Sequence, residues 1–229
     1  MTSIAATTMD APASAGTVPV VPDKVLASIR RFVSRLDSYG ETSYDFQTFY
    51  ASDLCRNAKQ LYYRKPLLGT AAVAPIIFCE AFLPSARRLF WKRQRFPIAD
   101  AHYAMGFAHL GTYLHDESYY RRALHFLQAL EDTRCPGYEN YCWGYPFNWG
   151  TLRGTIWAGT PLITTVPYVY EAFRAVYQID HNDRWRQIMR STAEHGFVDY
   201  KVCAVDKDWS ALKFARRSIT KAKPHLMCC

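Results

Sequence analysis

The segment 135–165 holds the residues of this chain whose types and spacing are best suited to binding a ligand. Between residues 135 and 157, seven of 23 side chains are aromatic, and glycines are interleaved among them. A loop of this length inside a helical domain is uncommon and is often functional. Aromatic faces with a few polar groups suit a sugar ring, whose axial C–H groups stack on π systems while its hydroxyls form hydrogen bonds. We therefore expect a carbohydrate site in this loop.

Two roles are open for the aromatic residues of this loop. They can line the site, or they can form a small core that holds the loop against the rest of the protein. We expect Phe147 and Trp149 to be core residues. We expect the site to be lined by Trp143, Tyr145, Asn148, Arg153 and Trp157.

Carboxylates are sparse near the loop, which limits the candidates for acid–base catalysis. Glycoside hydrolysis usually needs two carboxyl groups, about 5.5 Å apart or roughly 6.5–9.5 Å apart. Asp100 and Glu171 lie near the starts of two expected inner helices, so they form the pair that could face one cavity. A structural alternative stays open for both residues. Asp100 would then complement the positive end of a helix dipole, and Glu171 would pair with an arginine.

His102 and His109 are seven residues apart, so they lie on one face of the same expected helix. They are candidates for acid–base groups or metal ligands, but metal-binding pairs on helices prefer a spacing of about four, as in HExxH. We therefore expect these histidines in the core or behind the site. Signatures for dinucleotides, for phosphate loops, for a GxSxG nucleophile and for deaminases are also missing. The sequence predicts neither a metal site nor a cofactor.

Apolar residues at helical spacing dominate the chain, and strand alternation is scarce. Residues 98–115 and 167–179 are apolar on most sides, which is typical of buried helices. Residues 117–132 and 183–198 each carry a single apolar stripe, which is typical of outer helices. The order buried, outer, buried, outer predicts stacked helical hairpins and an all-α fold.

The two predicted hairpins also resemble each other in their turns. Tyr113 precedes the pair His115-Asp116, and Tyr177 precedes the pair His181-Asn182. In both cases an aromatic residue and an arginine then open the outer helix. The offset of about 64 residues is weak support for a repeat architecture.

The remaining segments of the chain indicate one further helix, the two tails and the cellular compartment. The apolar run 67–83 predicts a buried helix, because it is shorter than the about 20 residues of a membrane span. Residues 1–22 contain no Lys or Arg and no apolar core of a signal peptide, so they predict a disordered tail. The net charge is +8, and residues 201–229 predict a basic tail. The seven cysteines lack a CxxC spacing, which favours reduced thiols in the cytoplasm, with a Cys135–Cys142 pair as the alternative.

Buried and outer helix pairs joined by an aromatic–glycine loop resemble the six-hairpin (α/α) toroid superfamily, which includes glycosidases, polysaccharide lyases and uronyl epimerases. The strings YCWGYPFNW (141–149) and AGTPLITTVPYVYEAF (158–173) are similar to uncharacterised bacterial proteins of this kind. The resemblance covers residues 40–200 and implies activity on a bacterial polysaccharide or glycan. Glu171 or Asp100 would supply acid–base chemistry in a hydrolase. Tyr168 or His102 would do so in a lyase or epimerase, where a base abstracts a proton next to a carboxylate.

The resemblance also implies, by position, which residues line the cavity. Members of the family often carry an acid where Asn148 stands here, and an amide cannot act as a general acid or base. We therefore expect hydrogen bonding from this residue. Arg153 is expected to pair with an anionic sugar. The cavity residues implied by position are Trp143, Tyr145, Asn148, Trp149, Thr160 and Tyr168.

A closed toroid needs six hairpins, and the helical pattern supplies about three or four. An open half-ring would expose large apolar faces, which soluble monomers avoid. We therefore expect either a truncated product or a homodimer that completes the ring. We expect one α-hairpin domain over 23–200 that binds a carbohydrate, with no nucleic-acid partner and no transmembrane segment. The alternative to an enzyme is a non-catalytic glycan-binding or scaffold protein, or an inactive fragment.

Overall fold

The structure, a computed structural model, describes residues 21–200 and the backbone of two short strands at 202–204 and 210–212. The predicted disordered tail, apart from residues 21 and 22, lies outside the described residues. Most of the predicted basic tail lies outside them as well. The chain divides into two compact units, Met1–Glu41 and Thr42–Cys229.

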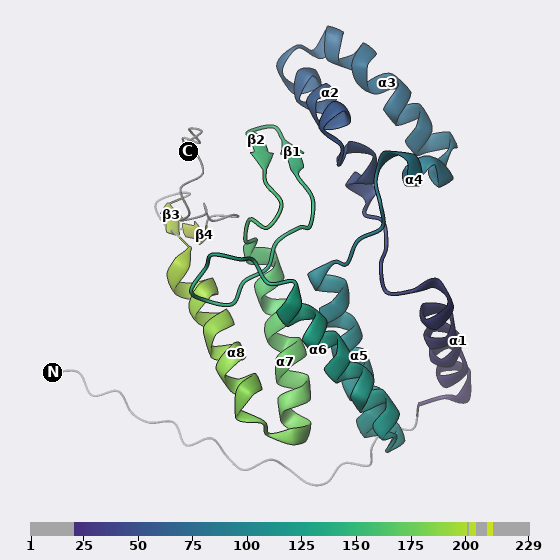
Figure 1. Cartoon of the computed structure of the whole chain (residues 1–229), viewed down its shortest axis with the longest axis vertical. Coiled ribbons are helices and arrows are strands. Elements are labelled where there is room, and N and C mark those ends of the chain that lie inside the picture. The colour runs from purple at the N-terminus through teal and green to yellow at the C-terminus, as the bar shows by residue number, and fades with distance from the viewer. Residues whose placement is uncertain (1–20, 201, 205–209, 213–229) are drawn as a thin grey trace, which may run out of the picture. The chain divides into compact units, whose positions relative to one another are not determined.

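The fold is all-α, as the periodicity predicts (Figure 1). Short 3-10 turns at Phe46–Tyr50, Pro84–Ala86 and Ile163–Thr165 lie next to helices, and a π-helical turn at His195–Asp199 extends the last helix. The helices of the described residues are α1 Asp23–Tyr39, α2 Asp53–Arg64, α3 Pro66–Phe82, α4 Arg87–Phe90, α5 Pro97–Leu114, α6 Glu117–Asp132, α7 Val166–Asp180 and α8 Asp183–Glu194.

The four helices from α5 to α8 form two helical hairpins, as predicted. Helix α5 packs on α6, and α7 packs on α8. The two hairpins meet mainly through α5 and α7, which are the two helices that the sequence indicates as inner. Proline starts α5 at Pro97, where its missing N–H has no helical partner to lose.

The turns of the two hairpins share an unusual backbone. His115 and His181 adopt the left-handed conformation, with φ of 53° and 52°, and they are the non-glycine residues with positive φ in the described part of the chain. The next residue in each turn, Asp116 or Asn182, accepts a hydrogen bond from the main-chain N–H two residues on and so caps the outer helix. The two histidines are 66 residues apart. The likeness between the hairpins therefore extends from sequence to backbone.

A third helical hairpin is formed by α2 and α3, which the single residue Lys65 joins. The side chain of Ser52 caps α2 by accepting from the N–H of Cys55. The two helices approach closely at Gly69. A Cβ at this position would lie 2.0 Å from the Cα of Tyr62, so a larger residue would push the helices apart.

The apolar run 67–83 is a helix, as predicted, but the prediction that this helix is buried is wrong. Helix α3 buries Gly69, Val73 and Ile76, which share the face that packs on α2. The other faces are open to solvent, with Leu67 91% exposed and Phe78 56% exposed. The sequence shows that all sides of this helix are apolar, but it does not show how many neighbours cover them.

The long loop between α6 and α7 is built on a small β-hairpin. Strand β1 (Trp149–Thr151) pairs antiparallel with β2 (Gly154–Ile156) through the two-residue turn of Leu152 and Arg153. An isolated bridge between Gly144 and Pro161 closes the base of this hairpin. A second antiparallel pair, β3 (Val202–Ala204) with β4 (Ser210–Leu212), follows α8.

The core of the second unit is rich in aromatic side chains. Phe107 and Phe126 stack with their ring centroids 5.7 Å apart, between α5 and α6. The loop contributes to the same core, because Trp143 packs on Phe173 of α7. The largest fully buried side chains are Trp143, Phe49, Phe126, Phe173, Leu127 and Leu130.

Candidate functional site

The structure places Trp143 in the core rather than on a surface. Its side chain is 0% exposed, and its indole N–H donates to the carbonyl oxygen of Leu130 at 2.6 Å. Its own carbonyl accepts from the hydroxyl of Thr165 at 2.9 Å. The stacking role predicted for Trp143 has no exposed face in this structure, and the residue instead anchors the loop to α6.

Three further aromatic residues form a small cluster at the base of the β-hairpin. Tyr145 and Phe147 stack in parallel with centroids 5.4 Å apart, and Trp149 meets Tyr145 edge-on at 5.6 Å. Phe147 is buried, as predicted, whereas Tyr145 and Trp149 are half-buried. Burial, together with the nearby carboxylate of Asp45, raises the pKa of the Tyr145 hydroxyl. The alternative of a mini-core therefore describes these three rings well.

Trp157 is the aromatic residue of the loop that offers an open face. Its side chain is 59% exposed, directly after strand β2. The guanidinium of Arg56 lies over its ring at 5.8 Å from the centroid, a cation–π arrangement that fixes the orientation of the indole. Because Arg56 approaches from the protein side, the exposed surface of the ring is free to stack on a ligand.

Arg56 belongs to α2, and its side chain lies against the hairpin. Its side chain is 7% exposed, and it pairs with the exposed carboxylate of Asp53 at 2.6 Å. Gly150 makes room for it, since a Cβ on this glycine would lie 2.9 Å from the Arg56 Cγ. The planar guanidinium can therefore lie against the indole while it stays paired with Asp53.

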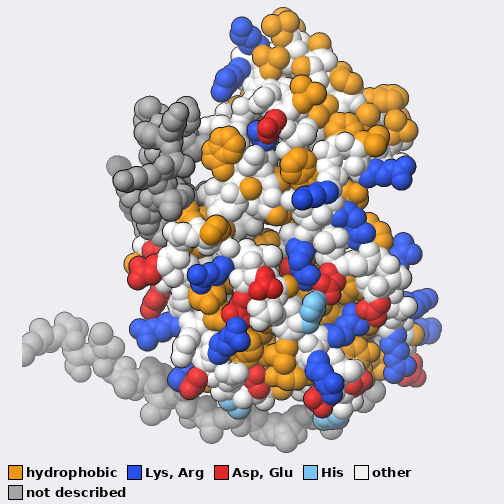
Figure 2. All heavy atoms as spheres, viewed as in Figure 1, with side chains coloured by type: hydrophobic (Ala, Val, Ile, Leu, Met, Phe, Trp, Pro, Cys, Tyr) orange, Lys and Arg blue, Asp and Glu red, His pale blue; other side chains and the backbone are white. Residues whose placement is uncertain are grey.

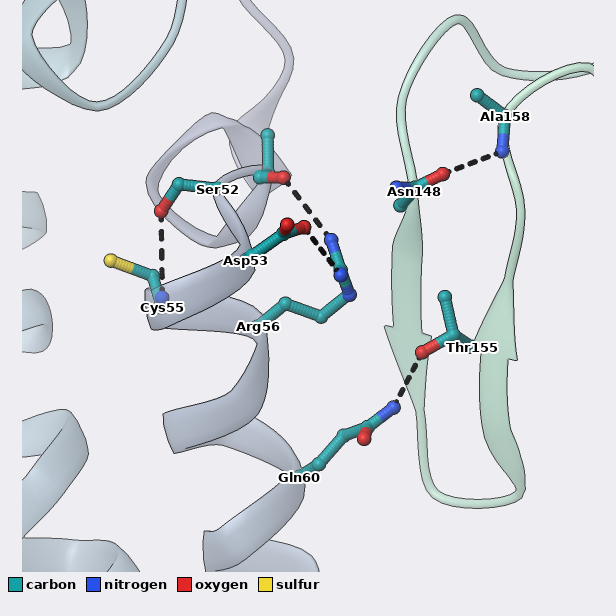
Figure 3. Close-up of polar contacts among 9 residues, drawn as sticks. Ser52, Asp53, Cys55, Arg56, Gln60, Asn148, Thr155 and Ala158 are labelled. Carbon is teal, nitrogen blue, oxygen red and sulfur yellow. Dashed lines mark hydrogen bonds and ion pairs between the residues drawn. The ribbon is translucent and has the colours of Figure 1, made fainter.

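Polar contacts join the β1–β2 hairpin to α2 and link the two sides of the hairpin (Figure 3). Gln60 of α2 donates to the hydroxyl of Thr155 at 2.7 Å. The side-chain oxygen of Asn148 accepts from the N–H of Ala158 at 2.9 Å, which leaves the amide NH₂ of Asn148 as the group that can donate to a ligand. The site residues that the sequence predicts include Asn148 and Trp157, and the structure brings these two together.

The remaining loop residues flank this surface. Arg153 is exposed in the turn at the tip of the hairpin, where its guanidinium can reach an anionic group. Thr160 is half-buried, and its N–H donates to the carbonyl oxygen of Trp157 at 3.0 Å. Thr160 therefore shapes the main chain beneath Trp157.

A second group of predicted residues meets where α5 packs on α7. The rings of His102 and Tyr168 lie 5.0 Å apart, and both side chains are exposed. The Nδ1 of His102 lies 2.8 Å from the carbonyl oxygen of Ile98, which can only accept, so Nδ1 carries the proton and Nε2 holds the lone pair in the neutral ring. The expectation that His102 and His109 are core residues is wrong, because α5 buries other faces and leaves this one open.

The two acids predicted for catalysis are in different environments. Asp100 is 0% exposed and accepts two hydrogen bonds from Arg95, at 3.2 and 3.1 Å. Glu171 is about half exposed and pairs with Arg174 on the same helix at 2.8 Å. Asp100 thus faces the protein interior and Glu171 faces solvent. The arginine partner that the structural alternative predicts for Glu171 is present.

One buried polar network was not predicted from the sequence. His195 is 0% exposed, its Nδ1 lies 2.8 Å from an oxygen of Asp199, and its Nε2 lies 3.3 Å from the hydroxyl of Tyr200. Asn140 of the loop also donates to Asp199, at 3.3 Å. The four-residue spacing of His195 and Asp199 is the sequence signal for this pair, and the π-helical turn brings them together. The network holds the start of the loop against the end of α8.

The described residues contain no cluster of three or more His, Cys, Asp or Glu side chains arranged to bind a metal ion. Cys135 and Cys142 are buried free thiols, and the N–H of Cys135 donates to the carbonyl oxygen of Cys142 at 2.8 Å. Comparison of the chain with models of protein families, with curated proteins and with solved structures finds no match.

Proposed function

We propose that this protein binds a carbohydrate through the surface formed by Trp157, Asn148 and Arg153 on the β1–β2 hairpin. The observation that carries the proposal is the indole of Trp157, which is exposed on one side and held in place by Arg56 on the other. A rigid, half-exposed aromatic ring beside amide and guanidinium donors suits the C–H face and the hydroxyls of a sugar. Arg153 at the tip of the hairpin favours a sugar that carries a carboxylate, as in acidic bacterial polysaccharides.

The burial and the ion pairs of the two candidate acids, Asp100 and Glu171, favour carbohydrate binding over hydrolysis. A general acid must reach the glycosidic oxygen, but Asp100 is sealed from solvent and occupied by Arg95. Glu171 is paired with Arg174 and lies on a different element from Trp157. The non-catalytic glycan-binding protein is therefore the better account of the hairpin.

Titration with acidic and neutral oligosaccharides tests this proposal. We expect the protein to bind the acidic oligosaccharides. Trp157→Ala should lower the affinity at least tenfold. Arg153→Gln should lower the affinity less, by a factor that grows as the salt concentration falls. Leu152→Ala is the matched control, because Leu152 is 75% exposed in the turn of the same hairpin and has no polar group. Equal affinity of wild type and Trp157→Ala would contradict the proposal, as would no binding of any oligosaccharide at millimolar concentration.

A second candidate function is a lyase of the (α/α) toroid type, and the close approach of the His102 and Tyr168 rings favours it. In this proposal α5 and α7 are the inner helices of a toroid. The Nε2 of His102 would remove the proton next to the carboxylate of a uronic acid, and the hydroxyl of Tyr168 would donate to the departing oxygen. Elimination then forms a carbon–carbon double bond conjugated with the carboxylate.

Ultraviolet absorbance of that unsaturated product distinguishes this candidate from simple binding. We expect the absorbance to rise with wild type and to stay flat with His102→Gln and with Tyr168→Phe. His109→Gln is the matched control, since His109 lies on the same exposed face of α5 two turns away. A rise in absorbance that persists in His102→Gln would exclude His102 as the base. No rise with any uronate polymer would exclude the lyase, and carbohydrate binding would then be the only proposed function that remains.

A further inference from the structure

Helix α3 has more apolar surface than its neighbours, chiefly α2, cover. Its apolar face consists of Leu67, Leu68, Ile77, Phe78 and Phe82, which are 50–91% exposed. At 100° per residue these positions cover roughly half of the helix circumference, opposite the face that packs on α2. Hydrophobic side chains gather over α2 and α3 in Figure 2, with Lys and Arg at the margin. An exposed patch of this kind marks a surface that contacts another apolar phase.

Basic residues stand at both ends of this apolar face. Arg64 and Lys65 directly precede α3, and Arg88 and Lys92 follow it, and all four are exposed. Within the part of the chain that the structure describes, none of the four forms an ion pair with an acid. Residues 64–95 contain seven bases and one acid, so this segment is strongly basic.

We propose that α3 is a docking helix that lies in the surface of a bilayer containing anionic lipids. Its apolar face would enter the boundary between headgroups and acyl chains by about 5–10 Å. The bases at its two ends would lie at the level of the headgroups, where each Lys or Arg strengthens binding about fivefold. This surface does not include Trp157 or His102, so it is independent of the function proposed above.

Charge distinguishes the bilayer from a second copy of the chain as the occupant. A two-fold dimer brings the same patch of each copy together. Both ends of α3 are basic, so either the parallel or the antiparallel pairing of two α3 helices places like charges against each other. An anionic bilayer surface, in contrast, complements both ends at once.

The length and bend of this segment indicate a helix that lies on the membrane. With 17 residues, α3 is about 25 Å long, which is shorter than the roughly 30 Å of a hydrocarbon core. Among the described residues, no single helix combines the length and the apolar character of a membrane span. In this described part of the chain, only the helix pair Pro66–Phe82 and Pro84–Phe90 has the required length and apolar character together, and this pair is bent by 113°. A bent pair with basic residues at both ends of its first helix fits an in-plane arrangement.

Co-sedimentation with vesicles tests the proposal on the full chain. The probes are vesicles of phosphatidylcholine alone and of phosphatidylcholine with 30% phosphatidylserine. We expect binding to the anionic vesicles and at least tenfold weaker binding to the neutral ones. Phe78→Asp should reduce binding at least tenfold, while the control Phe197→Asp, an equally polar change at a site that is 81% exposed, should leave binding unchanged. The double variant Arg88→Gln, Lys92→Gln should bind the anionic vesicles about tenfold or more weakly than wild type, and this difference should be smaller at high salt.

The oligomeric state of the same variants, measured by light scattering, gives the second readout. Circular dichroism and melting of Phe78→Asp should match wild type, since the side chain is already exposed. Wild type that stays in the supernatant with anionic vesicles overturns the proposal. Equal binding by wild type and Phe78→Asp overturns it too. A wild-type dimer that Phe78→Asp dissociates, without binding to vesicles, would assign this face to self-association instead.

Discussion

Replacing Trp143 and Trp157 each by phenylalanine makes one chemical change in two different environments. Trp143 is sealed in the core and donates to Leu130 at 2.6 Å. Trp157 is 59% exposed and rests on Arg56. If the loop is divided into a core part and a ligand-binding part, the first variant should lose stability and the second should lose binding.

The expected magnitudes follow from these contacts. In Trp143→Phe the carbonyl of Leu130 loses its indole donor but keeps a bond from the N–H of Thr133 at 3.2 Å, so the lost hydrogen bond costs about 1 kcal/mol. The smaller ring also gives up the burial of two carbon atoms, at about 0.8 kcal/mol each, and leaves a cavity. The free energy of unfolding should therefore fall by about 2–4 kcal/mol. Trp157→Phe loses no hydrogen bond, and its cost should stay near 0.5 kcal/mol.

Urea unfolding followed by far-ultraviolet circular dichroism measures the first quantity, and oligosaccharide titration of the folded variants measures the second. We expect Trp143→Phe to retain wild-type affinity and Trp157→Phe to bind several-fold more weakly. Equal stabilities of the two variants, or a greater loss for Trp157→Phe, would refute this division of the loop. So would a loss of affinity in folded Trp143→Phe as large as in Trp157→Phe.

Three further predictions concern packing and titration. Gly69→Ala should lower the free energy of unfolding, measured with urea, by about 1–3 kcal/mol, because the new Cβ would meet the main chain of α2. The control Gly106→Ala places its Cβ in open space, so it should leave the free energy of unfolding unchanged or raise it. Burial and a 2.7 Å bond to Asp180 raise the pKa of the Tyr120 hydroxyl. The resulting stabilisation is complete below the unfolded pKa of 10.0 and is lost as the pH rises beyond it, so Tyr120→Phe should melt with a shallower alkaline fall in Tm. His195→Ala removes a buried ring with two partners, so it should cost about 3 kcal/mol and speed amide exchange in the loop it holds.

The helical hairpins could be predicted from the sequence because their signals are local. The pattern predicts a helix over 98–115, and α5 spans Pro97–Leu114. The apolar period, the proline at the start and the capping Asp116 after the turn all lie within or beside that stretch. The second hairpin has the same set of signals, so its helices can be predicted from the sequence equally well.

The roles of the loop aromatics depend on contacts that are distant in sequence. Trp143 is buried because it reaches Leu130, and Trp157 is exposed on a platform that Arg56 supplies from about a hundred residues earlier. Nothing adjacent to either tryptophan distinguishes the two. The same limit applies to α3, whose apolar sequence is equally typical of a core helix and of a helix that meets a membrane.

The two-residue turns at His115 and His181 also bear on the order in which the chain folds. Contacts inside each hairpin join residues that are close in sequence, so they cost little loop-closure entropy and are expected early. The β1–β2 hairpin docks on α2 through Gln60 and Thr155, which are 95 residues apart, so this step is expected after the transition state. A ligand held on the docked hairpin would then slow unfolding and leave the folding rate unchanged.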